Sequence, residues 1–315
     1  MTESRYPDSI ELCEVAPRDG FQAEDEWIPT EKKIEIIRKL ADTGVSSMEV
    51  TSFVHPKAIP QLKDAEEVVQ AVQDISTMKM RALVPNVKGA ERAIGAGIKK
   101  LKLMLSATDA HSLSNANATV EEAQKKLEPI AELAEKENVN VGGSISVAFG
   151  CPYEGRVTEK QLYPILKRYQ QMNVQEVSLA DTTGMANPKQ VHHMLQDLQA
   201  AFPDMTFSMH LHNTRGLALA NMAAGMEQGI RRFDSSIAGL GGCPYAPGAT
   251  GNVPTEDVVH MLEEMSIKSG ISLEKIIQAA KEVKNIIGHD GGSYMLQAGP
   301  NSQLHDKVES QNKVN

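Results

Sequence analysis

The chain has 315 residues and a formal net charge of −9 at pH 7, and 41% of its residues are hydrophobic. The acidic balance argues against general nucleic-acid binding. No run of about 18 apolar residues predicts a membrane span, and the first eight residues lack the apolar centre of a signal peptide. The three cysteines form no CxxC pair, which favours free thiols in a reducing compartment. We expect a cytoplasmic protein that binds neither nucleic acid nor a membrane.

Short apolar runs alternate with longer helical patterns along most of the chain. The short runs predict eight strands, over residues 10–16, 47–53, 80–84, 100–106, 139–148, 176–181, 206–213 and 232–238. The longer patterns predict eight helices, over residues 31–43, 64–74, 87–96, 119–137, 158–172, 188–201, 217–228 and 255–269.

This alternation favours a (β/α)8 TIM barrel of the α/β class. The main competing fold, a doubly wound open sheet, would need a phosphate-binding fingerprint after its first strand, and the run Ala-Pro-Arg-Asp-Gly at 16–20 is not one. Extra C-terminal helices follow the barrel, with one predicted over 272–287. We divide the chain into an N-terminal extension (1–9), one catalytic barrel (10–298) and a flexible C-terminal tail (299–315).

Two histidines in the seventh predicted strand suggest a metal site. His210 and His212 are two residues apart, so both imidazoles lie on one face of the strand and can reach one ion. Asp19 follows the first strand, and reactive groups in such barrels gather at the C-terminal ends of strands. With Asn252 and water completing the set, oxygen ligands suit Mg²⁺ or Mn²⁺, while the imidazoles also admit Zn²⁺ or Co²⁺. The alternative is that both histidines are hydrogen-bonded barrel residues.

Three further residues have both a catalytic and a structural interpretation. Arg18 could stabilise a developing oxyanion beside the cation, or only pair with Asp19. Glu49 could order Arg18, and as a buried carboxylate it should need a cationic partner. Cys243 ends a glycine-rich run that could move as a lid and bring a thiol to a substrate, or it could be a spectator thiol in a turn.

Four segments resemble a known family. They are Ala-Pro-Arg-Asp-Gly-Phe-Gln at 16–22, Glu-Val-Thr-Ser-Phe-Val at 49–54, Gly-Cys-Pro-Tyr-Glu-Gly at 150–155 and Ala-Gly-Leu-Gly-Gly-Cys-Pro-Tyr-Ala at 238–246. Over residues 10–290 the chain resembles 3-hydroxy-3-methylglutaryl-CoA (HMG-CoA) lyases, which belong to a metal-dependent lyase and acyl-CoA synthase superfamily on (β/α)8 barrels. The cysteine-containing segment is the most specific of the four.

The resemblance implies a set of site residues. Four of them would hold a divalent cation, Mg²⁺ or Mn²⁺: Asp19, His210, His212 and Asn252. Five would be catalytic: Arg18 at the enolate-like thioester oxygen, His210 with Asp19 as the acceptor of the hydroxyl proton, Cys243 in proton transfer to the acetyl-CoA carbanion, and Glu49 in support. Arg18, Asp181 and Thr183 would contact the substrate, and we expect the same of Arg215, which departs from the family pattern and adds a cation near the metal-binding strand.

The reaction implied is a retro-Claisen cleavage of an HMG-CoA-type thioester to acetyl-CoA and acetoacetate or an analogous keto acid. The resemblance also suggests a homodimer and a place in leucine degradation, with terpenoid breakdown or another pathway left open. The chain departs from the family pattern at four places. Ala16 and Ala180 stand where the family commonly has glycine, Asn-Thr-Arg follows His212 in place of Asp-Thr-Tyr, and residues 108–118 lack a Lys-Lys-Asn-like run. The acyl group therefore stays open, and a citramalyl-CoA-like or longer-branched 3-hydroxyacyl-CoA is a second candidate. The chain could also be a Claisen condensing enzyme of the same superfamily or a non-catalytic acyl-CoA-binding barrel.

Overall fold

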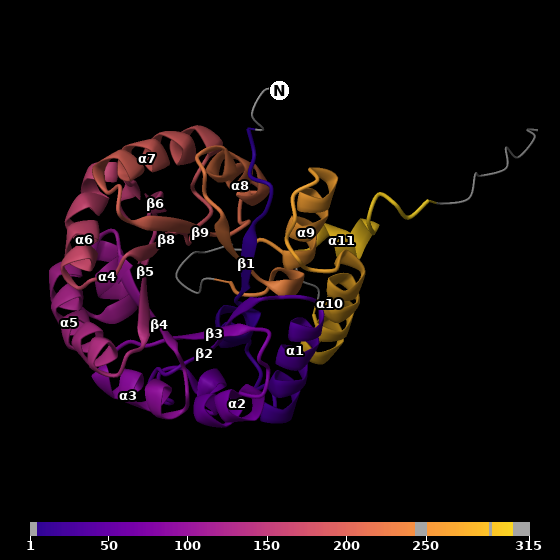
Figure 1. Ribbon diagram of the computed structural model, residues 1–315, viewed down its shortest axis with the longest axis horizontal. Helices are drawn as coiled ribbons and strands as arrows, with labels where there is room; N and C mark the ends of the chain where they lie inside the picture. Colours follow the sequence, from indigo (N-terminus) through magenta and orange to yellow (C-terminus); the bar gives the residue numbers. More distant parts are fainter. Residues whose placement is uncertain (1–4, 243–250, 290–291, 305–315) are drawn as a thin grey trace, which may run out of the picture.

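The computed structural model describes residues 5–242, 251–289 and 292–304. Eight parallel strands form a closed barrel in the order β1-β10-β9-β8-β5-β4-β3-β2, which confirms the predicted TIM barrel and rejects the open sheet (Figure 1). The strands are β1 (Glu11–Glu14), β2 (Ser47–Ser52), β3 (Lys79–Leu83), β4 (Lys100–Ser106), β5 (Asn140–Ser146), β8 (Glu176–Asp181), β9 (Thr206–Leu211) and β10 (Arg232–Ser235). A short hairpin of β6 (Gly150–Cys151) and β7 (Gly155–Arg156) lies outside the barrel.

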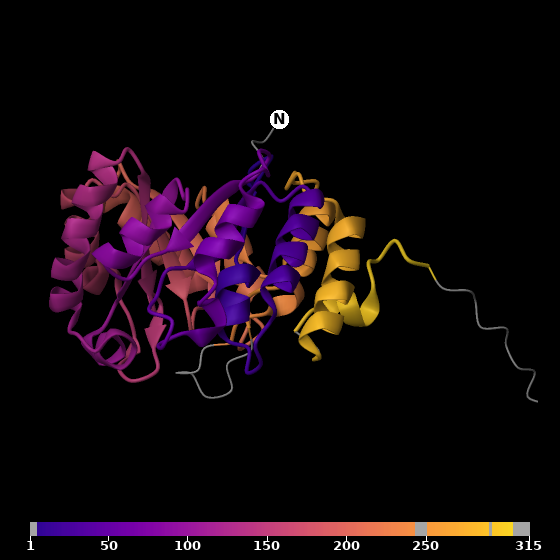
Figure 2. The same cartoon turned by 90° about the horizontal axis from the view of Figure 1, so that it is seen from below.

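Helices surround the strands in Figure 1, and Figure 2 shows the C-terminal helices, in yellow, at one side of the barrel. The helices are α1 (Thr30–Asp42), α2 (Ala65–Val72), α3 (Val87–Gly95), α4 (Asp109–Ala116), α5 (Val120–Lys136), α6 (Glu159–Gln171), α7 (Pro188–Ala201), α8 (Ala218–Glu227), α9 (Thr255–Glu264), α10 (Leu273–Ile287) and α11 (Tyr294–Ala298). Helix α10 corresponds to the helix predicted over 272–287 and packs against α1 and α9. The sequence patterns did not predict α4 and α11.

Local sequence signals explain where several helices begin and end. Helix α7 starts at Pro188, and the Asn187 side chain accepts a hydrogen bond from the backbone of the first turn. Helix α5 begins with a reciprocal capping box between Thr119 and Glu122. Helix α10 ends at Gly288, whose φ of 81° is accessible to glycine without strain. Among the described residues, no helix is both long and apolar enough to cross a bilayer.

The two faces of the barrel strands differ in chemistry. In β4, Leu101, Leu103 and Leu105 belong to the hydrophobic core, while Lys102 is equally buried but pairs with carboxylates of other strands. Because side chains alternate along a strand, the apolar residues face the helices and the polar residues face the barrel interior. The barrel interior is therefore charged, and the functional site is built on top of it.

Candidate metal centre and active site

Asp19, His210 and His212 form a compact cluster of possible metal ligands, with one ligand atom of each within 4.8 Å of the others. Nε2 of His210 lies 3.2 Å from Nε2 of His212. Oδ2 of Asp19 lies 3.7 Å from Nε2 of His210 and 3.9 Å from Nε2 of His212. Three ligand atoms at these separations can surround one ion, since metal–nitrogen and metal–oxygen bonds are about 2.0–2.2 Å long. The cluster joins β9 to the segment that follows β1, as the sequence predicted.

A one-turn π-helix, η1 (Ala16–Gly20), places Asp19 at the barrel mouth. The backbone N–H groups of Arg18 and Asp19 both donate to the carbonyl oxygen of Val15, at 3.0 and 2.7 Å. The π-helix is rare and is found frequently at functional sites. Here it follows directly on β1 and brings the guanidinium of Arg18 and the carboxylate of Asp19 to the same opening.

Asn252 completes the set of possible ligands from the chain beyond β10. Its backbone forms an isolated antiparallel bridge with His212, and its Nδ2 donates to Asp19 Oδ2 at 2.7 Å. Gly241 makes this approach possible, because a Cβ there would lie 2.5 Å from Asn252 Nδ2 and its φ is 99°. The Oδ1 atom of Asn252 is buried and has no hydrogen-bond partner among the described residues.

These residues fit a divalent cation. Two imidazoles, a carboxylate and an amide oxygen are all accepted by Mn²⁺, Zn²⁺ and related ions. A buried carbonyl-type oxygen without a hydrogen-bond partner is costly in a folded protein. A cation bound at this site would be a partner for Oδ1 of Asn252. Burial raises the pKa of the Asp19 carboxyl, but the guanidinium of Arg18, with the neighbouring imidazoles and the hydrogen bond from Asn252, brings it below the usual value, so Asp19 is anionic.

Arg18 is held by two carboxylates, one on each side. Its Nε donates to Glu49 Oε1 and its Nη1 donates to Asp19 Oδ1. Glu49 is fully buried, and although burial alone would raise its pKa, the surrounding cations lower it well below the usual range. A carboxylate on each side fixes the plane of the guanidinium and leaves its Nη2 for a substrate oxygen.

Asp234 on β10 is a site residue that the sequence analysis missed. Its Oδ2 lies 3.2 Å from Nδ1 of His210, and the carboxylate also pairs with Arg81 at 2.8 Å and with Lys102 at 3.1 Å. Burial raises the pKa of Asp234, but these cations lower it well below its usual value. An ionised carboxylate only accepts hydrogen bonds, so Nδ1 of His210 carries the proton and Nε2 presents its lone pair to the cation position.

Replacement of Asp234 by asparagine is expected to weaken Mn²⁺ binding by about 10- to 100-fold, because the negative charge that orients and polarises His210 is lost. Titration calorimetry with Mn²⁺ measures this directly. Asp197→Asn removes an exposed carboxylate from α7 and serves as the matched control. If both variants bind Mn²⁺ with the same affinity, Asp234 does not support cation binding.

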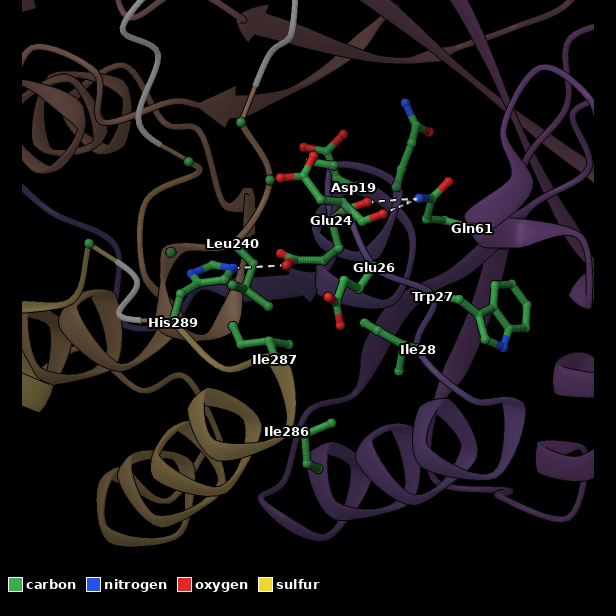
Figure 3. A pocket seen from close by; sticks show the side chains of 18 of the residues that line it. Asp19, Glu24, Glu26, Trp27, Ile28, Gln61, Leu240, Ile286, Ile287 and His289 are labelled. Atoms are coloured by element: carbon green, nitrogen blue, oxygen red, sulfur yellow. Dashed lines mark hydrogen bonds and ion pairs between the residues drawn. The ribbon is translucent and has the colours of Figure 1, made fainter.

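Two cavities adjoin the cluster. A chamber of about 100 Å³ is lined by Asp19, His210 and His212, by Arg18 and Lys102, and by residues of β4, β5 and α4. A larger cleft of about 980 Å³ runs outward from Asp19 (Figure 3). Apolar side chains of Ile28, Leu240 and Ile287 line it together with acidic residues, and Glu24 pairs with His289 at 2.8 Å. Asp19, Gln22 and Gly242 line both cavities, so the small chamber, called the reaction chamber below, adjoins the wide cleft.

Three residues that the sequence assigned to substrate binding lie together but outside the lining of the chamber. Asp181 accepts hydrogen bonds from the backbone N–H groups of Met185 and Ala186, at 2.8 and 3.1 Å. Thr183 donates to the carbonyl of Gly150, and Arg215 donates to the carbonyl of Thr183 at 2.6 Å. Their contacts stabilise the turns after β8 and β9, and their substrate role stays a prediction. Cys243 lies outside the described residues.

Comparison with known proteins agrees with this geometry. Residues 9–283 match the family model described as HMGL-like. A relative from Bacillus subtilis, named hydroxymethylglutaryl-CoA lyase, is 44% identical over 93% of this chain and 98% of its own length. The human mitochondrial protein of that name is 37% identical, with 93% and 90% covered. A solved structure of an HMG-CoA lyase from Acinetobacter baumannii is described in complex with coenzyme A and 3-methylmalate. Its sequence is 41% identical to this chain, and the two structures superpose with a TM-score of 0.92. The match covers 98% of this chain and 100% of the Acinetobacter chain. The chain therefore belongs to the HMGL-like family.

Proposed function

We propose that this protein acts as a hydroxymethylglutaryl-CoA lyase, which cleaves HMG-CoA to acetyl-CoA and acetoacetate with the help of a divalent cation. The observation that carries the proposal is the joining of Asp19, His210 and His212 with the guanidinium of Arg18 at one barrel mouth. The relatives that share up to 44% of the sequence carry the same name, and they support a carbon–carbon lyase. The acyl-CoA substrate is supported by the coenzyme A described in the Acinetobacter structure.

The residues divide the reaction between them. Loss of the proton from the C3 hydroxyl lets the C2–C3 bond break, and its electron pair moves into the thioester as an enolate. The free Nη2 of Arg18 would stabilise the charge on that thioester oxygen. A proton delivered to C2 completes acetyl-CoA, and acetoacetate departs. A bound divalent cation would polarise the substrate oxygens and lower the pKa of the hydroxyl.

The contacts of His210 bear on which residues could carry the two protons of the proposed reaction. Nδ1 of His210 is bound to Asp234, so Nε2 is the one ring nitrogen of this residue that faces the chamber. Cation binding and proton acceptance would therefore use the same atom, which favours His210 as a ligand over His210 as a base. The carboxylate of Asp19, the other group that the resemblance assigns to this step, is then the proposed acceptor of the C3 hydroxyl proton. We assign the delivery of the proton to C2 to the thiol of Cys243, on the family resemblance alone.

Several finer properties belong to the same proposal. Mg²⁺ or Mn²⁺ is the proposed cation, because a carboxylate and an amide oxygen accompany the two imidazoles. A homodimer and a role in leucine degradation are proposed from the family resemblance. A cytoplasmic location is proposed from the sparse cysteines without a CxxC pair, and one relative in rat carries the word cytoplasmic in its name.

Incubation of the purified protein with HMG-CoA and Mg²⁺ or Mn²⁺ is expected to release acetyl-CoA and acetoacetate in equal amounts. Chelation with EDTA should stop the reaction, and added Mn²⁺ should restore it. The same ion should raise the free energy of unfolding by about 2.7 kcal/mol when its free concentration is 100 times the Kd. Binding of Mn²⁺ without cleavage of HMG-CoA would contradict the proposed substrate but not the metal site.

A panel of related thioesters separates the candidate reactions. Citramalyl-CoA and a longer-branched 3-hydroxyacyl-CoA test the acyl group, and 3-methylmalyl-CoA is included because the Acinetobacter structure is described with 3-methylmalate. Acetyl-CoA mixed with acetoacetate or another keto acid tests the condensing direction. The substrate with the highest kcat/KM identifies the reaction.

A further inference from the structure

His111 is a buried histidine in the reaction chamber to which neither the fold nor the metal centre assigns a role. It is 3% exposed and lines the same cavity as Arg18, His210 and His212. It belongs to α4, in the segment 108–118 where the sequence departs from the family pattern. A buried imidazole is costly unless its nitrogens find partners, so its presence here calls for an explanation.

The fold fixes the position of His111 through two contacts. Thr108, the N-cap of α4, accepts a hydrogen bond from the backbone N–H of His111 at 3.4 Å. The Nδ1 atom of His111 lies 2.8 Å from the hydroxyl oxygen of Ser106, the last residue of β4. Both partners belong to the chain immediately before α4, so the ring is held on the chamber wall. Its Nε2 is the nitrogen left for a ligand.

The protonation of the ring follows from these contacts. Burial lowers the pKa of His111, which favours the neutral imidazole. The hydroxyl of Ser106 can rotate to donate to Nδ1, and the proton of the neutral ring is then on Nε2. In this tautomer Nε2 is a hydrogen-bond donor available to an acceptor in the chamber that His111 lines.

Other donors line the same wall. Asn115 lies four residues after His111, so both side chains are on one face of α4, and Ser146 pairs in register with Ser106 across β4 and β5. Neither side chain forms a hydrogen bond within the described residues. By contrast, the cations of the chamber are already engaged: Arg18 pairs with Asp19 and Glu49, and Lys102 pairs with Glu49 and Asp234.

We propose that His111 is a specificity-determining residue that donates from Nε2 to the free carboxylate of the acyl group, with Asn115 and Ser146 beside it. The inference rests on the proposed function, whose substrate carries an anionic tail opposite the thioester. The neutral donors recognise the tail carboxylate, while Arg18, whose Nε and Nη1 are engaged by Glu49 and Asp19, keeps its Nη2 for the thioester oxygen. A hydrogen bond between a neutral donor and a charged acceptor contributes enough binding free energy to discriminate between acyl groups with and without a carboxylate.

The test compares two thioesters on the Mn²⁺-loaded full-length protein: HMG-CoA, and 3-hydroxy-3-methylbutanoyl-CoA, in which a methyl group replaces the carboxymethyl tail. His111→Phe is expected to raise KM for HMG-CoA by about 10- to 100-fold with little change in kcat, and to reduce the preference for HMG-CoA by the same factor. His111→Gln keeps an N–H donor and should recover most of the preference. Leu113→Ala, an exposed position on the same helix, is the control.

The outcomes separate this inference from the proposed function. If the wild type cleaves HMG-CoA and His111→Phe keeps the full preference for the carboxylated substrate, the role of His111 is overturned. The same conclusion follows if His111→Phe weakens Mn²⁺ binding as much as it raises KM, because the residue would then support the metal centre. If the wild type cleaves neither thioester, the proposed function fails. The role of His111 is then decided by calorimetry, in which His111→Phe must weaken binding of free 3-hydroxy-3-methylglutarate but not that of 3-hydroxy-3-methylbutanoate.

Discussion

Substitution of His212 by alanine is expected to remove the divalent cation and to lower kcat/KM by at least about 10³-fold. The imidazole supplies one of the three clustered ligand atoms, and a catalytic cation contributes several kcal/mol of transition-state stabilisation, with each 1.36 kcal/mol equal to a factor of ten. The cation content after dialysis, measured by mass spectrometry of the metal, and the rate of acetyl-CoA release give the two readouts.

The fold should survive this substitution, because His212 projects into a cavity and not into the apolar layer between strands and helices. Circular dichroism and the Tm of the metal-free proteins check this point. His193→Ala, which removes an exposed imidazole from α7, should retain both cation and activity. If His212→Ala binds Mn²⁺ as tightly as the wild type, His212 is not a ligand and the interpretation as a hydrogen-bonded barrel residue is correct.

The sequence was sufficient for the fold because the barrel depends on patterns that are local in the chain. The strand predictions at 100–106 and 176–181 match β4 and β8 to the residue, since apolar and polar residues alternate there and helices flank them. The cluster of possible metal ligands could be predicted for a related reason. The ends of parallel strands meet at one barrel mouth, so residues at the ends of the first and seventh predicted strands must approach each other.

The partners of the site could not be predicted in the same way. The sequence suggested that Glu49 orders Arg18, but not that Lys102 pairs with Glu49 and Asp234. These three residues come from three strands, and their pairing depends on the register and tilt of the closed barrel. A signal was present, because Lys102 stands between two leucines of a strand whose apolar face is buried. A charge at such a position faces the barrel interior and needs a buried partner, but the sequence does not say which one.

Two local structures near the site were also missed. The run 16–20 reads as a loop after a strand, and only the structure shows that it winds into the π-helix that aims Asp19. Helix α4 is short, and its residues 109–116 lack a clear apolar periodicity because the buried positions are His111 and Ser112. An apolar pattern identifies helices that pack on a core, and α4 instead covers a reaction chamber.

Substitution of Arg18 by lysine is expected to lower kcat by about 10²- to 10³-fold, as is found when one donor to a developing oxyanion is removed. The planar guanidinium reaches Glu49, Asp19 and the substrate oxygen with three different nitrogens, and a lysine has only one. Steady-state kinetics with HMG-CoA measure kcat and KM separately. The loss should appear in kcat, because the charge on the thioester oxygen develops only as the carbon–carbon bond breaks.

Cation binding distinguishes this catalytic role from a structural one. Arg18 competes with the cation for the charge of Asp19, so its replacement should leave Mn²⁺ affinity unchanged or raise it. In Arg18→Ala, added guanidinium ion should restore part of the lost rate if the position acts by charge and hydrogen bonding. A parallel fall in kcat and Mn²⁺ affinity, without rescue by guanidinium, would show that Arg18 serves only to hold Asp19 in place. The oxyanion would then have to be stabilised by another group.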